Sequence, residues 1–152
     1  MNIRPAQGDE AEALSALALK AKAYWGYAAD TIELWKPDLA VSTHTIASGP
    51  SFVAVLANEI VGFYSLSPSH HSWRLDHLWV LPQFMHRGIG RALVAHALET
   101  AARGGASSVT VDADPNAETF YLACGAERYG EVPAPIPGQP KRVRPQLAFR
   151  AL

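Results

Sequence analysis

Cysteine is almost absent from this sequence. Its 152 residues include one, Cys124, so no disulfide can form within the chain and nothing demands an oxidising compartment. A basic excess is absent too, because 13 Lys and Arg stand against 14 Asp and Glu, for a formal net charge of -1. A nucleic-acid-binding surface normally needs a strong basic excess, so we expect no nucleic-acid partner.

Long apolar runs are also missing. No segment approaches the roughly 20 apolar residues of a membrane-spanning helix, so we expect no membrane partner. The first residues, "MNIRPAQGDEAEAL", carry acidic side chains where a signal peptide needs a basic start and an apolar run. We therefore expect a cytoplasmic protein.

The composition is that of an ordinary globular domain, with 49% apolar and 18% charged residues, and we expect one domain over residues 1–152. Apolar periodicity predicts helices at 9–22, 30–36, 42–48, 90–103 and 116–127, with Asp9 capping the first and Pro37 ending the second. Strands are predicted at 2–6, 51–68 (a hairpin turning at Asn58-Glu59), 72–82, 107–114 and, as an antiparallel pair, after 126. This order predicts an α+β fold, a central sheet with helices on both faces.

The stretch "LPQFMHRGIGRALV", residues 81–94, joins a predicted strand to a predicted helix. The first amides of that helix have no intrahelical partner and can bind an anion, and Gly88 and Gly90 let it approach the backbone. The Gly-Lys-Ser/Thr of a Walker loop is missing, and Leu93 occupies the third place of a dinucleotide fingerprint. The turn is therefore either a diphosphate cradle or a glycine turn that lets a helix pack closely.

Two segments together carry a resemblance. "LDHLWVLPQFMHRGIGRALVAHAL", followed about 25 residues later by "DPNAETFYLACGAERYG", resembles the GNAT family of acetyl-CoA-dependent N-acetyltransferases. The first segment is similar to the family's strand and pyrophosphate loop, with Met85 where the pattern has Gln or a base. The second is similar to its later helix, which brings an Asn and a Phe-Tyr pair to the cofactor. The order of elements fits the family along essentially the whole chain.

The resemblance implies a three-layer α/β/α fold with a mixed, mostly antiparallel twisted sheet, and acetyl-CoA as acyl donor. Backbone groups of Leu78, Trp79 and Val80 would pair with the pantetheine arm. Loop amides would hold the pyrophosphate, and the later helix would contact the pantetheine or thioester end. The implied cofactor-binding residues beyond the strand are Met85, His86, Arg87, Gly88, Ile89, Gly90, Arg91, Asn116, Phe120 and Tyr121.

Acetyl transfer to an amine needs a base, an acid and a donor for the developing oxyanion. The family uses a tyrosine at the place of Tyr121 as general acid, and a phenol stays protonated at neutral pH. Asp76, predicted on the same strand face as Leu78 and Val80, is the candidate base, and a backbone amide of Leu78 or Val80 would stabilise the oxyanion. The alternatives are a Phe-Tyr core pair for Tyr121 and an ion pair with Arg74 for Asp76.

Aromatic residues are dense in the first third, where relatives form the acceptor wall. Trp25 and Tyr27 are candidate substrate contacts for a small amine with an apolar or aromatic body, or simply core residues. The basic segment "GQPKRVRP" is either a solvated hairpin or a contact for the cofactor's 3′-phosphate or an acidic acceptor. The six histidines lack the spacing of a metal site, so we expect no metal.

The sequence thus predicts an enzyme that moves an acetyl group from acetyl-CoA to a primary amine, a small molecule or a peptide, by direct transfer. One alternative is an acyl-CoA-binding regulatory module without turnover, and another is a structural or partner-binding domain without acyl-CoA affinity. Relatives often form homodimers through their C-terminal strands, so a homodimer is possible here. The acceptor itself cannot be deduced from the sequence.

Overall fold

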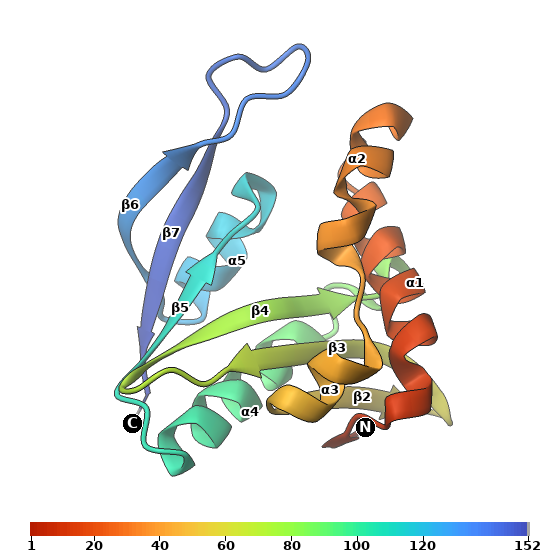
Figure 1. The fold of residues 1–152 in the computed structure, drawn as a ribbon, viewed down its shortest axis with the longest axis vertical. Helices are drawn as coiled ribbons and strands as arrows, with labels where there is room; N and C mark the ends of the chain where they lie inside the picture. Colours follow the sequence, from red (N-terminus) through yellow and green to blue (C-terminus); the bar gives the residue numbers. More distant parts are fainter. Residues whose placement is uncertain (152) are drawn as a thin grey trace.

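The computed structural model describes residues 1–151, and these form one seven-stranded sheet in the order β1-β2-β3-β4-β5-β7-β6 (Figure 1). The strands are β1 (Asn2–Pro5), β2 (Ser51–Leu56), β3 (Glu59–Ser67), β4 (Ser72–Val80), β5 (Ser108–Asp112), β6 (Glu127–Pro133) and β7 (Val143–Arg150). The helices are α1 (Ala11–Ala23), α2 (Ala29–Leu39), α3 (Thr43–Ser48), α4 (Ile89–Arg103) and α5 (Glu118–Ala123). Three 3₁₀ turns are η1 (Gly8–Glu10), η2 (Pro82–Phe84) and η3 (Pro115–Ala117).

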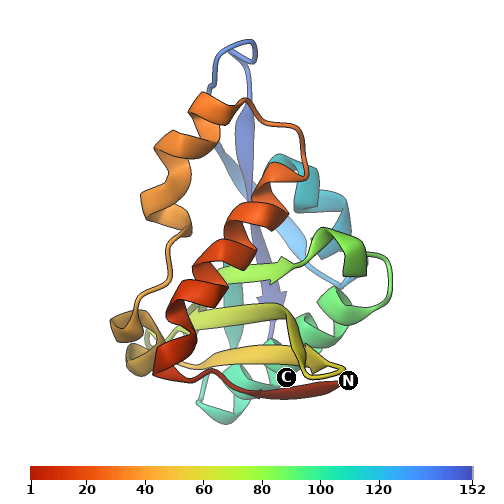
Figure 2. The ribbon, with the colours of Figure 1, turned by 90° about the vertical axis from the view of Figure 1, so that its right-hand side faces the viewer.

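Helices cover both faces of this sheet. Figure 2 shows α1 crossing the front of the sheet, with α4 behind it. One apolar cluster joins α1 and α2 to the sheet, around Leu14, Leu39 and Phe63. The other joins α4 and α5 to the opposite face, around Leu93 and Tyr121. This arrangement confirms the predicted three-layer α+β fold.

Every neighbouring pair of strands is antiparallel except β4 and β5. These two run parallel and pair only where Ser72–Arg74 face Ser108–Thr110. Beyond Arg74 they diverge, as Figure 1 shows, while β4 stays paired with β3 on its other edge as far as Val80. The edge of β4 from residue 75 to 80 therefore offers backbone N–H and C=O groups that no neighbouring strand uses.

A β-bulge interrupts β4 at Asp76. Ser65 pairs with His77 and Leu66 with Leu75, so Asp76 is an extra residue with no partner on β3. The strict alternation that we predicted is therefore wrong here. Leu75 packs on the α4 face together with Leu78, whereas Asp76 turns to the opposite face.

Three details of the helices differ from the predictions. Asp9 caps nothing, because the Glu10 carboxylate accepts the Gln7 amide at 2.8 Å instead. α2 continues through Pro37 to Leu39, since a proline in the last turn removes only one helical hydrogen bond and Leu39, 5% exposed, anchors the end of the helix in the core. The helix predicted over 116–127 is divided between η3 and α5.

The hairpin of β2 and β3 turns at Ala57 and Asn58, both with positive φ, one residue earlier than predicted. The other predicted strands, and the helices at 42–48 and 90–103, are confirmed to within a few residues. None of the helices within residues 1–151 is long and apolar enough to cross a membrane.

Candidate active site

A cleft of about 1110 Å³ opens where β4 and β5 separate. Its floor is β4, and its walls come from α1, α2, the loop before α4, the segment 111–121 and the start of β7. Most of the residues singled out from the sequence line it: Trp25, Asp76, Leu78, Trp79, Val80, Met85, His86, Gly88, Gly90, Arg91, Asn116, Phe120 and Tyr121. Three do not. Ile89 is buried in the core, the Arg87 guanidinium lies over the Phe84 ring at 5.2 Å, and Tyr27 lines a neighbouring hollow.

The loop before α4 presents a row of unused amides to this cleft. The Met85 amide donates to the Pro82 carbonyl at 3.2 Å, so it is not available to a ligand. The first amide bonded back into the helix is that of Ala92, which donates to Gly88 at 3.0 Å. The amides of residues 86–91 have no backbone partner within residues 1–151. A helix N-terminus with free amides is a favourable place for an anion.

The two glycines of this loop, Gly88 and Gly90, are required for different structural reasons. Gly88 has φ +82, a left-handed conformation that glycine adopts at little cost, and a Cβ built there meets no protein atom within 4 Å. A Cβ at Gly90 would lie 3.0 Å from Cζ of Phe120. Gly90 therefore lets α4 pack directly against the helix that carries Phe120 and Tyr121.

Tyr121 is the buried aromatic residue of α5. It is 6% exposed, and its ring meets those of Phe120 and Phe149 edge to face, with centroids 5.2 and 6.2 Å away. Burial, followed by the charges of Cys124 and Asp114, raises the pKa of its phenol. Its hydroxyl forms no hydrogen bond with residues 1–151. Tyr121 therefore reaches the cleft as a protonated phenol with its donor free.

Asp76 accepts a hydrogen bond from Ser67 and forms an ion pair with Arg74, with 2.6 Å between Oδ1 and Nε. Its side chain keeps 22% exposure, against 66% for Arg74. Because Ser67 and Arg74 are paired across β3 and β4, the Asp76 carboxylate lies on their face of the sheet, which α1 and α2 cover. The ion pair weighed from the sequence is present, and it leaves Asp76 within the cleft.

His77 also lines the cleft, and it is neutral. Burial lowers the pKa of its imidazole, against the opposing charge of Asp76. Trp79 Nε1 donates to His77 Nδ1 at 3.0 Å, so the ring proton is on Nε2. With Nδ1 occupied as an acceptor, neutral His77 has only its Nε2 hydrogen to donate, so Asp76 remains the candidate base.

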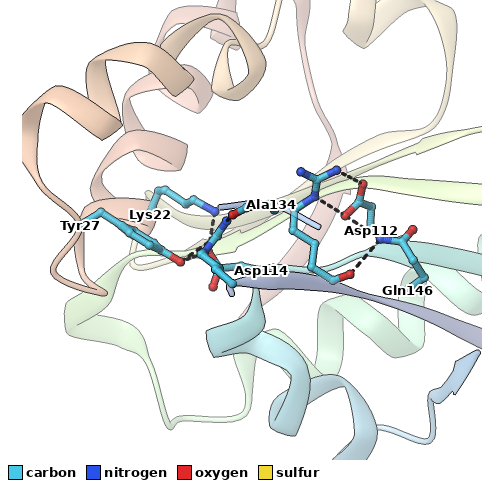
Figure 3. A network of polar contacts seen from close by, with 8 residues as sticks. Lys22, Tyr27, Asp112, Asp114, Ala134 and Gln146 are labelled. Carbon is cyan, nitrogen blue, oxygen red and sulfur yellow. Dashed lines mark hydrogen bonds and ion pairs between the residues drawn. The ribbon is translucent and has the colours of Figure 1, made fainter. Parts of the chain in front are cut away.

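A polar network that the sequence did not suggest forms another wall of the cleft (Figure 3). Asp114 Oδ2 accepts from Lys22 Nζ at 2.5 Å and from the Tyr27 hydroxyl at 2.8 Å. Arg142 donates to the same hydroxyl at 3.1 Å and lies 3.7 Å from Asp114. Asn116 Nδ2 donates to Tyr27 at 3.1 Å as well. The network therefore ties together the loop after α1, the loop after β5 and the loop before β7.

The charges in this network are buried. Burial, with the nearby Arg142 charge, lowers the pKa of Lys22 although Asp114 opposes this. For Asp114, burial alone would raise the pKa, but the Lys22 charge and the hydrogen bonds from Lys22, the Asn116 amide and Tyr27 lower it. The segment "GQPKRVRP" is thus not simply a solvated hairpin, because the Arg142 side chain is only 4% exposed.

Sequence reasoning missed Lys22, Asp114 and Arg142 as site residues. Lys22 looks like any lysine on an amphipathic helix, and its partner Asp114 is 92 positions away. No local pattern could connect them. Among residues 1–151, no three His, Cys, Asp or Glu side chains are grouped as a metal site would require.

Comparison with known proteins agrees with this geometry. The model of the acetyltransferase (GNAT) family matches residues 19–126, and the chain belongs to this family. A GCN5-related N-acetyltransferase from Rhodopseudomonas palustris is 24% identical, with a TM-score of 0.82 over 99% of this chain and 95% of that one. No curated protein matches the sequence.

Two further solved structures share the fold. PaiA N-acetyltransferase from Thermoplasma acidophilum, solved in complex with coenzyme A, is 17% identical with a TM-score of 0.79 over 98% of both chains. The ribosomal-protein-S18-alanine N-acetyltransferase from Escherichia coli is 14% identical, with a TM-score of 0.75 over 99% of this chain and 93% of that one. The protein is an acyltransferase of the GNAT family, and acetyl-CoA is its co-substrate.

The residues of the cleft fit this co-substrate. The free amides of residues 86–91 suit a pyrophosphate, and Gly88 leaves open the space that a Cβ would fill. The unpaired edge of β4 can take an extended arm with amide groups of its own, as it would take another strand. His86 and Arg91, both lining the cleft, add a protonatable and a positive group near the loop.

Proposed function

We propose that this chain acetylates a primary amine by direct transfer, and that residues 1–152 act as one catalytic domain. The observation that carries the proposal is the convergence on one cleft of a phosphate-binding loop, an unpaired strand edge, a free phenol and a carboxylate. These groups come from β4, the loop before α4 and α5. Packing between Gly90 and Phe120 keeps the loop and α5 together.

The carboxylate and the phenol move protons in the proposed reaction, and the strand edge stabilises the developing charge. Acetyl-CoA, when bound, supplies an acetyl group activated as a thioester. Asp76 takes a proton from the attacking amine, and Tyr121 gives the proton of its hydroxyl to the departing sulfur, so the amide and a thiol result. A free amide on the edge of β4, at Leu78 or Val80, donates to the developing oxyanion. Trp25 borders the place of the acceptor.

The acceptor belongs on the face of β4 that α1 and α2 cover, because Asp76 lies there. Structural relatives are named for different acceptors, such as the alanine of ribosomal protein S18. The acceptor of this chain therefore has to be argued from its own residues.

Calorimetric titration with acetyl-CoA, with ATP and NAD as comparisons, is the first test. Selective binding that Gly88→Glu weakens in a folded protein would support the cradle. Release of CoA in the presence of an amine, detected as free thiol, would then support transfer. Tight binding without thiol release over a broad amine panel would instead favour the regulatory module.

The homodimer and the cytoplasmic location stay predictions. β6 is one of the two edge strands of the sheet, and its residues are almost all exposed, with Tyr129 at 62%. A second copy pairing along this edge would cover it. Light scattering at two protein concentrations would test the dimer.

A further inference from the structure

The cleft contains an excess of buried positive charge at one place. Lys22 and Arg142 share a single carboxylate, that of Asp114, and their side chains are 12%, 4% and 6% exposed. The other charged pairs of the lining balance one to one, Arg74 with Asp76 and Arg144 with Asp112. The cluster of Lys22, Arg142 and Asp114 therefore has a net charge of about +1, in a region where water screens it weakly.

The donors of this cluster are not all used. Lys22 Nζ has three hydrogens and, within residues 1–151, one hydrogen-bond partner, Asp114. Arg142 Nε is buried and has no hydrogen-bond partner among residues 1–151. Lys22 lines the cleft, so its remaining hydrogens are the ones that a ligand can reach. Burying charged donors without acceptors is costly, which makes an additional acceptor at this place favourable.

The aromatic residues around the cluster are already occupied by these cations. Lys22 Nζ lies 4.7 Å from the centroid of the Trp35 ring and 5.3 Å from that of Tyr27. The Arg142 guanidinium lies 5.2 and 5.4 Å from the same two rings. These faces consequently cannot serve as a cage for the ammonium group of an acceptor. The aromatic cluster instead holds the protein's own cations in place.

We propose that the acceptor is a small amine that also carries a carboxylate, and that Lys22, backed by Arg142, binds this carboxylate. The inference rests on the proposed transfer to an amine and names the class of that amine. A monoanion matches the single excess charge, whereas a phosphate dianion would leave a buried negative charge without a counterion.

Negative charge lies elsewhere in the same cleft. Asp76 is on β4, and Asp38, on α2, is exposed and forms no ion pair within residues 1–151. Arg74 balances the charge of Asp76. It is therefore Asp38 that adds an unpaired negative charge to the lining, away from the unpaired positive charge of Lys22 and Arg142. This distribution suits a molecule with an ammonium and a carboxylate.

Lys22 lies on the α1 and α2 face of β4, where its Nζ is 5.9 Å from the ring of Trp79. The bulge turns Asp76 to this same face, where it accepts from Ser67. Binding the carboxylate at Lys22 therefore leaves the amine on the side of Asp76.

The test compares amines that differ only by the carboxylate. L-phenylalanine is paired with 2-phenylethylamine, and L-leucine with isopentylamine. Their binding to the protein saturated with CoA is measured by tryptophan fluorescence, for which Trp35 and Trp79 beside Lys22 are natural reporters. Acetylation of the same four compounds is measured with acetyl-CoA as thiol release. Lys22→Met removes the charge at similar length, and Lys20→Met, an exposed lysine of the same helix, is the matched control.

We expect the amino acids to bind at least about tenfold more tightly than their decarboxylated partners, as charge-assisted hydrogen bonds usually give. Lys22→Met should abolish this preference, Lys22→Arg should keep part of it, and Lys20→Met should leave it unchanged. If Lys22→Met does not fold, the comparison of the paired amines on the wild type and on Lys22→Arg still tests the carboxylate site.

Four results would each overturn the inference. These are equal affinities for the two members of a pair, tighter binding of the plain amines, no binding of either amino acid at millimolar concentration, and a preference that survives Lys22→Met. Failure of the proposed transfer looks different. If amino acids bind with a preference that depends on Lys22 but no thiol is released from acetyl-CoA, the proposed transfer is wrong and the carboxylate site is still supported.

Discussion

Replacing Tyr121 by phenylalanine should separate a catalytic tyrosine from a core tyrosine. The two aromatic contacts of this ring, with Phe120 and Phe149, do not involve the hydroxyl, so phenylalanine keeps them. The hydroxyl forms no hydrogen bond within residues 1–151, and Tyr121 lines a cleft that water can enter. Removing it therefore breaks no interaction that holds the fold.

The expected magnitudes follow from this. The free energy of unfolding should change by less than about 1 kcal/mol, because no buried partner of the hydroxyl is left unsatisfied. The turnover rate should fall by about 10²–10⁴-fold, the usual contribution of a positioned acid. Affinity for acetyl-CoA should stay within about threefold, since the amides of the loop and the edge of β4 are unchanged.

Urea unfolding, calorimetric titration with acetyl-CoA and thiol release would measure these three quantities on the same preparations. Tyr129→Phe, at a tyrosine that is 62% exposed on β6, is the control and should change none of them. Turnover that survives Tyr121→Phe would refute the role of Tyr121 as acid. A large loss of stability with unchanged turnover per folded molecule would show that Tyr121 has only a structural role in the core.

Three other substitutions, two of them with a matched control variant, test the loop before α4, the candidate base and the buried ion pairs. Gly88→Glu and Gly105→Glu both put a side chain at positive φ with open space around it, so each should cost about 1 kcal/mol of stability. Only Gly88→Glu should weaken acetyl-CoA binding in calorimetry, by about tenfold or more, because its carboxylate lies at the anion-binding helix end. Asp76→Asn should reduce turnover by about 10²–10⁴-fold with unchanged acetyl-CoA affinity, whereas Asp112→Asn, which also breaks a pair with an arginine, should keep turnover. Asp114→Asn should cost about 3 kcal/mol in urea unfolding at pH 7, since it leaves Lys22 and Arg142 unpaired. Folding lowers the pKa of Asp114, so its carboxylate stabilises the folded state above its ordinary pKa, and this stabilisation is lost as the pH falls through the lower, folded value. On acidification, Asp114→Asn should therefore lose less stability than the wild type.

Local patterns were sufficient for most of the fold. The strands and helices depend on periodicity and turn residues within about fifteen positions, and these predicted the layers correctly. The errors have local physical causes. Pro37 lies in the last turn of α2, where a proline removes only one helical hydrogen bond, and Leu39 anchors that turn in the core. Alternation in β4 breaks at Asp76 and His77, two consecutive polar residues, but such a pair also fits a regular strand with one polar side chain on each face, so it did not identify the bulge.

The site divides in the same way. The loop before α4 and the helix with Tyr121 are contiguous segments, so the sequence could identify them by resemblance. The network of Lys22, Asp114 and Arg142 joins the end of α1 to two loops that are far away along the chain. Its members carry ordinary roles when taken one at a time, a helix lysine, a capping aspartate and a basic loop. Only the three-dimensional arrangement shows that two cations depend on one carboxylate.

The bulge at Asp76 also explains how one strand can serve two ligands. Leu78 and Val80 pack on the α4 face, where the loop amides and Tyr121 lie. If β4 alternated regularly from Leu78 back to Asp76, this carboxylate would point into the same apolar cluster, where its charge would be costly. The extra residue turns it to the face of Lys22 and Trp79 instead. In the proposed reaction, β4 would thereby present its edge and one face to the acyl donor, and a carboxylate on its other face to the amine.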